Sequence, residues 1–530
     1  MKGDFTRRTF RDDKHFTRVL MQQGRVQLDA DWNEQLEIDA HAAGTTHTDV
    51  IGGCGVPKDG GGFAIGVTAD GHDLTIAPGR IYVDGILCEF GSEPVDVTAL
   101  TADRAGLVHL APGRRRLRTG DHLELSGGDA SVIVRVTGVD ADARRVGFEP
   151  SLDTATRGAL GPRVRARRTA TYATQPDLPS PPHVTVPDEG PPAVALDDGT
   201  YLVYLDVWER HVTTVEDPEL LEPALGGPDT TTRVQNVAQI RLARLAGGAS
   251  TCADVPGFDA LAAADAIAKP STGRLAARAT PEVTTGDCTM PEAAGFRGLE
   301  NQLYRVEVHT PGPLGTATFK WSRDNGTVVT RWLGQHGHDL EVADTGRDEV
   351  LSFAAGQTVE LTDASRVMAG EPGLLTTVHA PPRGDVLPVD PADAVSFADF
   401  ASDPIVRRWD SDGDEPTADG WIALEHGVEV RFTDGWYNTG DFWLIPARTA
   451  TGTVDWPRDD DDPPLERSPE GIVHGRCRLA VVRSASGSLT PLDDCRERCR
   501  VALAVAGRPD QPEHGIRLAR GLDCLGCELP

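Results

Sequence analysis

The stretch of sequence that decides the fold runs from Arg297 to Trp332 and reads RGLENQLYRVEVHTPGPLGTATFKWSRDNGTVVTRW. Side chains of different character alternate along residues 303–309 and again along residues 318–322, which is the period of a β-strand. Asn325 and Gly326 separate the second run from a third, and this dipeptide favours a hairpin because both central turn residues need a positive φ. The stretch therefore predicts a strand followed by a hairpin, in the middle of an antiparallel sheet.

Length and composition extend this interpretation to the whole chain. A protein of 530 residues is too long for one hydrophobic core, so several domains are expected. Its 57 glycines and 38 prolines favour short strands joined by turns over long helices. The Asp-Gly pairs at 70–71 and 84–85 each lie between apolar runs and predict two further hairpins.

From these patterns we expect a mainly β, multidomain protein, with a short N-terminal helical segment followed by several antiparallel β-sandwich or small-barrel modules. The expected parts are a helical segment over residues 1–55, a β-domain over 56–174 with an inserted β unit around 105–152, a linker over 175–197, a central antiparallel β-domain over 198–345, a C-terminal β-domain over 346–486, and a Cys-rich tail over 487–530.

Two helices are predicted in the N-terminal segment. Phe16 and Leu20 mark a short first helix that Gly24 ends. Asp31, followed three residues later by Glu34, resembles a capping box and predicts the start of a second helix.

The charge balance bears on partners and location. The formal net charge is -29 at pH 7, and such a surface repels nucleic acid phosphates and anionic membranes. No run reaches the ~18 apolar residues of a membrane-spanning helix, and the start MKGDFTRRTFRDDKH lacks the apolar core of a signal peptide. We therefore expect no nucleic acid partner, no membrane insertion, and synthesis in the cytoplasm without a signal peptide.

Familiar catalytic signatures are absent from the sequence. It contains no HExxH, no GxSxG, no Gly-Lys dipeptide of a phosphate-binding loop and no Gly-rich dinucleotide fingerprint. Carboxylates are so abundant that a glycosidase pair cannot be recognised without a measured separation between the two groups. The sequence thus names no catalytic residue and no cofactor-binding residue.

One acidic loop is a candidate calcium site. Asp410, Asp412 and Asp414 stand at every second position of DSDGDE, and an irregular loop can turn such carboxylates toward one hard cation. The alternative is a solvated acidic surface loop, since the glutamate that completes an EF-hand is missing.

The tail holds a candidate zinc site. Cys495 and Cys499 form one close pair and Cys524 and Cys527 another, and four thiolates can hold a tetrahedral structural zinc. A disulfide pair and free thiols are the alternatives. The nine cysteines of the whole chain are sparse and do not resemble a disulfide framework.

Several long motifs carry a resemblance to a known family. They are Met1–Arg7 (MKGDFTR), Gln22–Gln35 (QQGRVQLDADWNEQ), Tyr201–Arg210 (YLVYLDVWER), Glu222–Asp229 (EPALGGPD), Glu300–Val306 (ENQLYRV) and Ala317–Gly326 (ATFKWSRDNG). In these motifs the chain resembles proteins that begin MKGDFTR, contain a domain of unknown function, and are encoded with phage-tail-like extracellular contractile injection systems.

The resemblance implies a setting more than a chemistry. It suggests a non-enzymatic structural or adaptor component near the baseplate or outer surface of such a particle, oligomeric within the assembly and in contact with other particle proteins. It also suggests that the protein leaves the cell as part of the particle. The alternative belongs to another functional class, a protein that binds or hydrolyses a carbohydrate polymer of the cell envelope. Two carboxylates about 5 to 10 Å apart in a cleft would be the signature of the hydrolysing enzyme.

Overall fold

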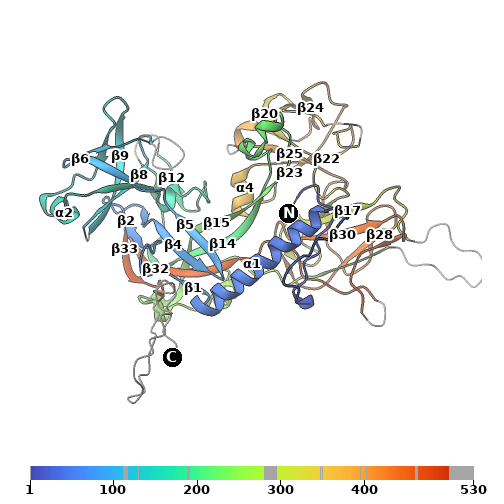
Figure 1. The fold of residues 1–530 in the computed structure, drawn as a ribbon, viewed down its shortest axis with the longest axis horizontal. Coiled ribbons are helices and arrows are strands. Elements are labelled where there is room, and N and C mark those ends of the chain that lie inside the picture. Colours follow the sequence, from blue (N-terminus) through green and yellow to red (C-terminus); the bar gives the residue numbers. More distant parts are fainter. Residues whose placement is uncertain are drawn as a thin grey trace, which may run out of the picture. The chain divides into compact units, whose positions relative to one another are not determined.

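The chain divides into two compact units in the computed structural model (Figure 1). The structure describes residues 2–110, 117–128, 130–187, 191–279, 295–346, 348, 350–393, 395–400, 403–459 and 463–499. Unit 1 comprises Met1–Asp39, Glu209–Gln235 and Ala268–Val473, and unit 2 comprises Ala40–Trp208, Asn236–Ile267 and His474–Pro530. Neither unit is therefore one continuous stretch of chain.

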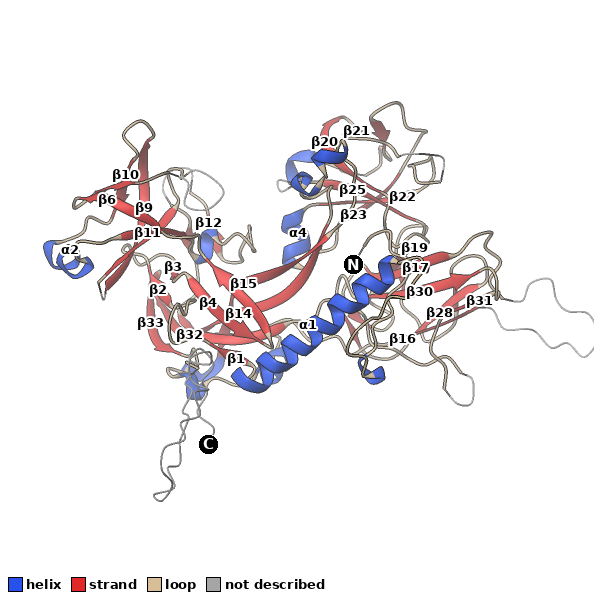
Figure 2. Ribbon diagram, in the orientation of Figure 1, coloured by secondary structure: helices blue, strands red, loops and turns tan. Residues whose placement is uncertain are grey.

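The predicted fold class is confirmed, because strands dominate the described residues (Figure 2). The α-helices are α1 (Asp29–Ile51), α2 (Thr154–Leu160), α3 (Phe258–Ala263) and α4 (Ala364–Ala369). Every paired strand with a recorded register in the described chain is antiparallel, as expected for sheets built from hairpins and returning strands. A search of the described helices found none long and apolar enough to cross a membrane.

Unit 2 is organised around a four-stranded sheet in the order β15-β14-β32-β33. Its strands are β14 (Gly199–Val212), β15 (Arg233–Leu245), β32 (Gly475–Ala485) and β33 (Ser488–Asp494). Val203 and Leu205 of β14 pack into one hydrophobic core, and Leu202 and Tyr204 pack into another with α3. Because both faces are covered, the sequence of β14 is an almost continuous apolar run.

Small sheets cover the first of these cores. They contain β1 (Cys54–Gly55), β2 (Ile65–Val67), β3 (Leu74–Ile76), β4 (Gly79–Val83), β5 (Ile86–Phe90), β12 (Val184–Thr185) and β13 (Ala193–Val194). The two predicted Asp-Gly hairpins are confirmed as β2-β3 and β4-β5. In the second, Asp84 and Gly85 have φ of 45° and 82°, the positive values that the turn requires.

A closed barrel in unit 2 has its own core. Its strand order is β10-β7-β6-β11-β8-β9. The strands are β6 (Val95–Leu100), β7 (Arg104–Leu107), β8 (His122–Gly127), β9 (Ala130–Asp140), β10 (Arg145–Glu149) and β11 (Arg165–Thr169). The core residues all fall between Val95 and Ala166, and the barrel takes in the segment around 105–152 that the sequence marks as a β unit.

Unit 1 contains a β-sandwich. A five-stranded sheet in the order β26-β19-β17-β30-β31 shares its core with a three-stranded sheet in the order β16-β28-β27. The strands are β16 (Leu275–Ala279), β17 (Gln302–Val308), β19 (Thr318–Ser322), β26 (Glu415–Pro416), β27 (Ile422–Ala423), β28 (Val428–Phe432), β30 (Phe442–Arg448) and β31 (Thr453–Val454), with a small pair of β18 (Gly312–Pro313) and β29 (Trp436–Tyr437). Tyr304, Phe319, Phe432 and Trp443 are fully buried in this core.

A second sheet of unit 1 has six strands in the order β23-β22-β25-β20-β21-β24. They are β20 (Val329–His336), β21 (Asp339–Val342), β22 (Thr358–Thr362), β23 (Leu374–Thr377), β24 (Val386–Pro388) and β25 (Ile405–Trp409). Its core contains Trp332, Phe353 and Phe400, and the ring of Trp332 contacts the rings of Phe397 and Phe400.

The Asn-Gly turn has the predicted backbone but not the predicted pairing. Asn325 and Gly326 have φ of 50° and 65°. The preceding strand β17 is also confirmed and pairs with β19, with Val306 opposite Trp321. However, β20 pairs with β25 and β21 instead of β19, so the turn leads the chain from one sheet into the other. Local sequence determines the turn, whereas non-local packing selects the partner strand.

The predicted first helix is wrong and the predicted second helix is confirmed. Residues 16–28 contain neither helix nor strand, and only a short 3-10 turn, Asp12–Lys14, precedes them. The backbone N–H of Val19 instead donates to the side chain of Gln35, 2.8 Å away on α1. This contact holds the segment against α1 in an irregular conformation, which an amphipathic pattern alone does not predict.

Candidate functional site

The three aspartates of the candidate calcium loop are not brought together. The Asp410 carboxylate accepts a hydrogen bond from the backbone N–H of Arg323 at 2.9 Å and lies 3.7 Å from Nε of Arg408. Asp412 and Asp414 are exposed. In the part of the chain that the structure describes, no group of three or more His, Cys, Asp or Glu side chains is arranged to hold a metal ion.

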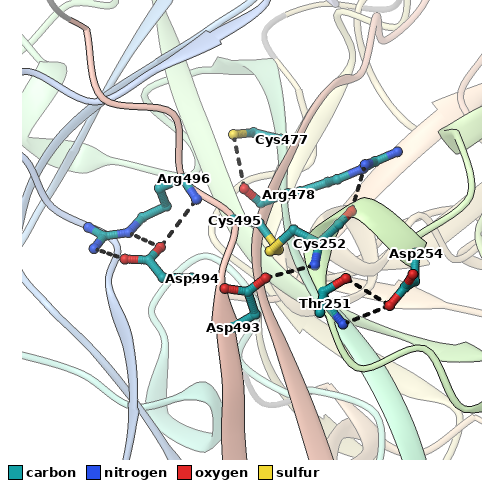
Figure 3. Close-up of a disulfide and its surroundings, with 9 residues drawn as sticks. All are labelled: Thr251, Cys252, Asp254, Cys477, Arg478, Asp493, Asp494, Cys495 and Arg496. Atoms are coloured by element: carbon teal, nitrogen blue, oxygen red, sulfur yellow. Dashed lines mark hydrogen bonds and ion pairs between the residues drawn. A yellow bond between two sulfur atoms is a disulfide. The ribbon is translucent and has the colours of Figure 1, made fainter.

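The two described tail cysteines, Cys495 and Cys499, are not arranged as zinc ligands. Cys495 forms a disulfide with Cys252, and the backbone N–H of Cys252 donates to Asp493 at 2.9 Å (Figure 3). This disulfide uses the sulfur that a zinc site would need. Cys499 is buried beside Gly55, where an added Cβ would come within 2.5 Å of its sulfur. Cys524 and Cys527 lie outside the described residues.

A second disulfide joins Cys54 and Cys477, so the expectation that the cysteines do not form a disulfide framework needs correction. The partners are 423 residues apart in this bridge and 243 residues apart in the other. Disulfide frameworks are recognised in sequences by close, regular spacings, and these long separations provide none. Both bridges lie within unit 2.

A group of buried ionisable side chains lies in unit 1, and we call it the charged cluster. Its members are Lys2, Arg305, Glu307, Lys320, Glu360 and Arg407. They come from the N-terminal segment, β17, β19, β22 and β25. All except Lys2 are at least 95% buried. Charges in such a place are tolerated only when they are paired and hydrogen-bonded.

Glu307 is the first of two carboxylates in the charged cluster. It accepts from Nε of Arg305 at 2.6 Å and lies 2.9 Å from Nζ of Lys2. The Arg305 guanidinium also stacks on the ring of Phe442, 3.7 Å from its centroid. Burial by itself raises the pKa of Glu307, but Lys2, Arg305 and Lys320 together hold it well below its usual range.

Glu360 is the second carboxylate. It accepts from Nζ of Lys320 at 2.5 Å and from the indole N–H of Trp409 at 2.9 Å. Burial raises its pKa, and the ammonium groups of Lys320 and Lys2 outweigh burial and lower the pKa to about 2. Lys320 also lies 3.2 Å from Nδ1 of His309, whose pKa is lowered by burial and by Lys320, so the neutral ring can accept this hydrogen bond.

Lys2 connects the N-terminal motif to this cluster. Its side chain keeps 26% exposure, and burial of the rest lowers its pKa to about 8 against the opposing effect of Glu307. The neighbouring Gly3 carbonyl accepts from the side-chain amide of Asn325 at 2.9 Å. Thus the Asn-Gly turn and the first residues of the chain, two of the motifs in the sequence, contact one another.

The residues that follow Lys2 contact α1 in the same way. Thr6 donates to Asp29 through its hydroxyl at 2.6 Å and through its backbone N–H at 2.9 Å. Arg8 pairs with Glu37 at 2.8 Å, and the hydroxyl of Thr9 donates to Glu34 at 2.6 Å. The side chains of Lys2 and Thr6 in the N-terminal motif, and of Arg8 and Thr9 just after it, therefore bind the protein itself.

A cavity of about 430 Å³ lies beside this segment. Its lining includes Gly3, Phe5, Asn325, Val328 and Phe353, together with the carboxylates of Asp4, Asp324 and Asp344 and the guanidinium of Arg448. Asp324 lies 3.2 Å from Arg408, and burial, with Asp410 nearby, raises its pKa. No His, Cys, Ser or Lys occurs among the described lining residues. The cavity can thus bind a small polar group, and its described lining lacks the Ser, Cys or His of the familiar nucleophile–base pairs.

Comparison with known families identifies the chain. The matching family model, described as a family of unknown function, covers residues 1–103, 163–272 and 250–505. The chain belongs to family DUF6519. Neither a comparison with curated proteins nor one with solved structures gave a match for this DUF6519 chain.

The part of the DUF6519 chain that the family model leaves unmatched coincides with most of the closed barrel. Residues 104–162 contain β7 to β10 and α2, whereas the matched flanks contain β6 and β11. These two strands pair, with Arg165 opposite Asp96. The family model therefore leaves out four of the six barrel strands, and the matched strands on either side of the gap are neighbours in the barrel.

Sequence reasoning did not identify the charged cluster. The sequence did carry a signal, because charged residues stand between apolar ones in strands that are buried on both faces. They are Lys320, between Phe319 and Trp321, and Arg305 and Glu307, on either side of Val306. Charged residues at alternate positions usually indicate a solvent-exposed face. Only the tertiary structure shows that a second sheet and the N-terminal segment cover that face.

Proposed function

We propose that this DUF6519 protein is a non-enzymatic structural or adaptor component of a phage-tail-like contractile injection particle, in its baseplate or outer-surface region. The motifs that resemble proteins encoded with such particles suggest the setting. The described part of the chain supports the non-enzymatic role, because its buried charged cluster is paired within itself and no His, Cys, Ser or Lys lines its cavity.

The observation that carries the proposal is that residues of the MKGDFTR motif contact other parts of the same chain. Lys2 is fixed by Glu307, Gly3 by Asn325 and Thr6 by Asp29, so these positions serve internal contacts. A motif used in this way stabilises the start of the chain on a rigid sheet. That arrangement suits a protein whose function is to hold a fixed place among neighbours.

The cavity favours a second candidate, binding of an envelope carbohydrate. It combines the rings of Phe5 and Phe353 with the polar groups of Asn301, Gln302 and Asp4, a mixture typical of small-molecule sites. Retention of the protein on purified cell-envelope polymer, lost in a Phe5→Ala variant whose thermal unfolding is unchanged, would support this candidate.

The test of the first proposal is sedimentation from cells that make the protein. An affinity-tagged chain is followed through a density gradient, with sheath and tube proteins as particle markers. We expect co-sedimentation with these markers that survives about 1 M salt, where screening removes loose charge contacts. A protein confined to the light fractions, while sheath and tube sediment normally, would refute the particle role.

A further inference from the structure

The segment between the 3-10 turn and α1, residues 16–28, exposes apolar side chains, and we call it the arm. Leu20 and Val26 are 77% and 82% exposed, and Phe16 and Met21 are more than half exposed. The adjacent face of α1 adds Trp32, at 60%. Soluble proteins seldom leave so many large apolar side chains together in water unless the surface binds something.

The backbone of the arm also has unused hydrogen-bonding groups. Within the described residues, three backbone N–H groups of the arm donate hydrogen bonds. That of Val19 donates to the side chain of Gln35, that of Arg25 to the carbonyl of Gln22, and that of Leu28 to the side chain of Asp31. The arm belongs to no helix and no strand. Its remaining N–H and C=O groups are therefore available for pairing with another surface.

The charge of the arm is opposite to that of the protein. Residues 1–28 contain seven Lys and Arg against three Asp and Glu, whereas the whole chain contains 52 against 81. Arg18 and Arg25 lie in the arm itself, which has no carboxylate, and no ion pair is recorded for them within the described residues. A basic, apolar arm thus extends from a strongly acidic protein.

We propose that the arm of one copy, together with Trp32, docks on the acidic surface of a second copy of this chain. Charge complementarity carries the choice of partner, because the acidic surface that would attract Arg18 and Arg25 is present on every copy.

The proposal has a geometric consequence. Each copy contributes one arm and one acidic surface, so exchange of arms joins copies either as a closed dimer, if it is reciprocal, or as a ring, if each arm binds the next copy in turn and the rotation between copies closes. Either outcome gives a defined oligomer of this chain alone. The inference therefore goes beyond the particle role and can be tested on purified protein without any particle.

Sedimentation velocity of the purified full chain over a range of concentrations provides the first measurement. We expect a defined oligomer at about 0.1 M salt that weakens at about 1 M, as the screening length falls from about 10 Å to about 3 Å. Leu20→Asp with Val26→Asp, and separately Arg18→Glu with Arg25→Glu, should each raise the dissociation constant more than about tenfold. These side chains are exposed, so the substitutions leave the fold intact, which circular dichroism checks.

Matched controls place the same substitution elsewhere. Val186→Asp and Val473→Asp also introduce a carboxylate at positions that are 79% and 80% exposed, and they should leave the dissociation constant unchanged. A wild-type protein that is monomeric at every concentration would overturn the proposal. An oligomer that the arm variants and the controls weaken equally, or not at all, would overturn it as well.

Crosslinking then shows which surface the arm contacts. A photoreactive residue at position 20 is introduced into a mixture of isotopically heavy and light protein. We expect crosslinked peptide pairs that combine heavy and light copies, with the second peptide rich in Asp and Glu. Crosslinks confined to single copies would mean that the arm folds back on its own chain, and binding of monomeric protein to anionic phospholipid vesicles would assign the arm to a membrane; either result contradicts the proposal.

Discussion

The substitution Glu360→Gln tests whether the charged cluster stabilises unit 1. Glu360 is 4% exposed, and its two oxygens accept from Lys320 at 2.5 Å and from the indole of Trp409 at 2.9 Å. Glutamine has the same shape and keeps one acceptor, but it removes the charge. Lys320, which is 1% exposed, would keep Glu307 at 3.6 Å, a carboxylate already shared with Lys2 and Arg305.

The expected loss follows from this geometry. Removing one partner of a buried ion pair costs about 3–5 kcal/mol, and the retained acceptor places Glu360→Gln near the lower limit, at about 3 kcal/mol. For a unit of this size that loss lowers the melting temperature by roughly 6–12 °C. Adding Lys320→Met removes the uncompensated charge, so the double variant should recover most of the loss.

Tryptophan fluorescence is the suitable assay, since eight of the nine tryptophans belong to unit 1 and only Trp208 belongs to unit 2. Glu466→Gln is the matched control, because its carboxylate pairs with Arg431 at 3.0 Å on the surface and should contribute no more than about 1 kcal/mol. Equal, small effects of Glu360→Gln and Glu466→Gln would refute the reasoning. So would a double variant that is less stable than Glu360→Gln alone.

Four further predictions concern other features. Burial lowers the pKa of His211 from 6.5 to about 3, so between these pH values the unfolded chain binds a proton that the folded chain does not. The stability of unit 1 should therefore fall as pH falls from 6.5 toward 3. His211→Phe should flatten this pH dependence in fluorescence-detected unfolding. Reduction of the Cys54–Cys477 and Cys252–Cys495 bridges should destabilise unit 2 by about 2–5 kcal/mol without moving the fluorescence transition of unit 1, as calorimetry with parallel fluorescence can check. Gly326→Val, at a φ of 65°, should cost unit 1 about 1–3 kcal/mol in thermal unfolding, whereas Gly420→Val, at a glycine with open space around its Cβ and no positive φ, should change it by less than about 0.5 kcal/mol. Replacing residues 93–167 by two glycines should remove the barrel, because the backbones of Ser92 and Arg168 are already hydrogen-bonded at 3.0 Å and a short link can join them. Both disulfides should stay intact in a non-reducing peptide map. Scrambled disulfides would show that the barrel supports the rest of unit 2.

The sequence predicted those features that depend on neighbouring residues. Positive φ at Asn325 and Asp84, the strand at 318–322 and the mainly β class all follow from local preference and alternation. The same reasoning failed where distant segments meet. The Asn-Gly pattern predicted that β19 and β20 pair as a hairpin, whereas in the structure β19 and β20 belong to two different sheets.

The candidate site was less predictable than the fold. Lys2 and Glu307 are brought together although they lie 305 residues apart in the chain, and the disulfide partner of Cys495 is 243 residues away. Such contacts leave no spacing pattern in one sequence. The apolar residues of the arm did leave a pattern, but it was assigned to a helix because nothing in the sequence says whether an apolar stripe is covered.

The central claim is that this DUF6519 protein is a particle component, and quantitative mass spectrometry of purified injection particles tests it most directly. Particles from independent preparations are washed at high salt, and the amount of this chain is compared with the amounts of sheath and tube protein. We predict a constant ratio of the chain to these proteins in every preparation, as a built-in component requires. A chain that is absent from the washed particles, or present in a ratio that varies between preparations, would contradict the claim.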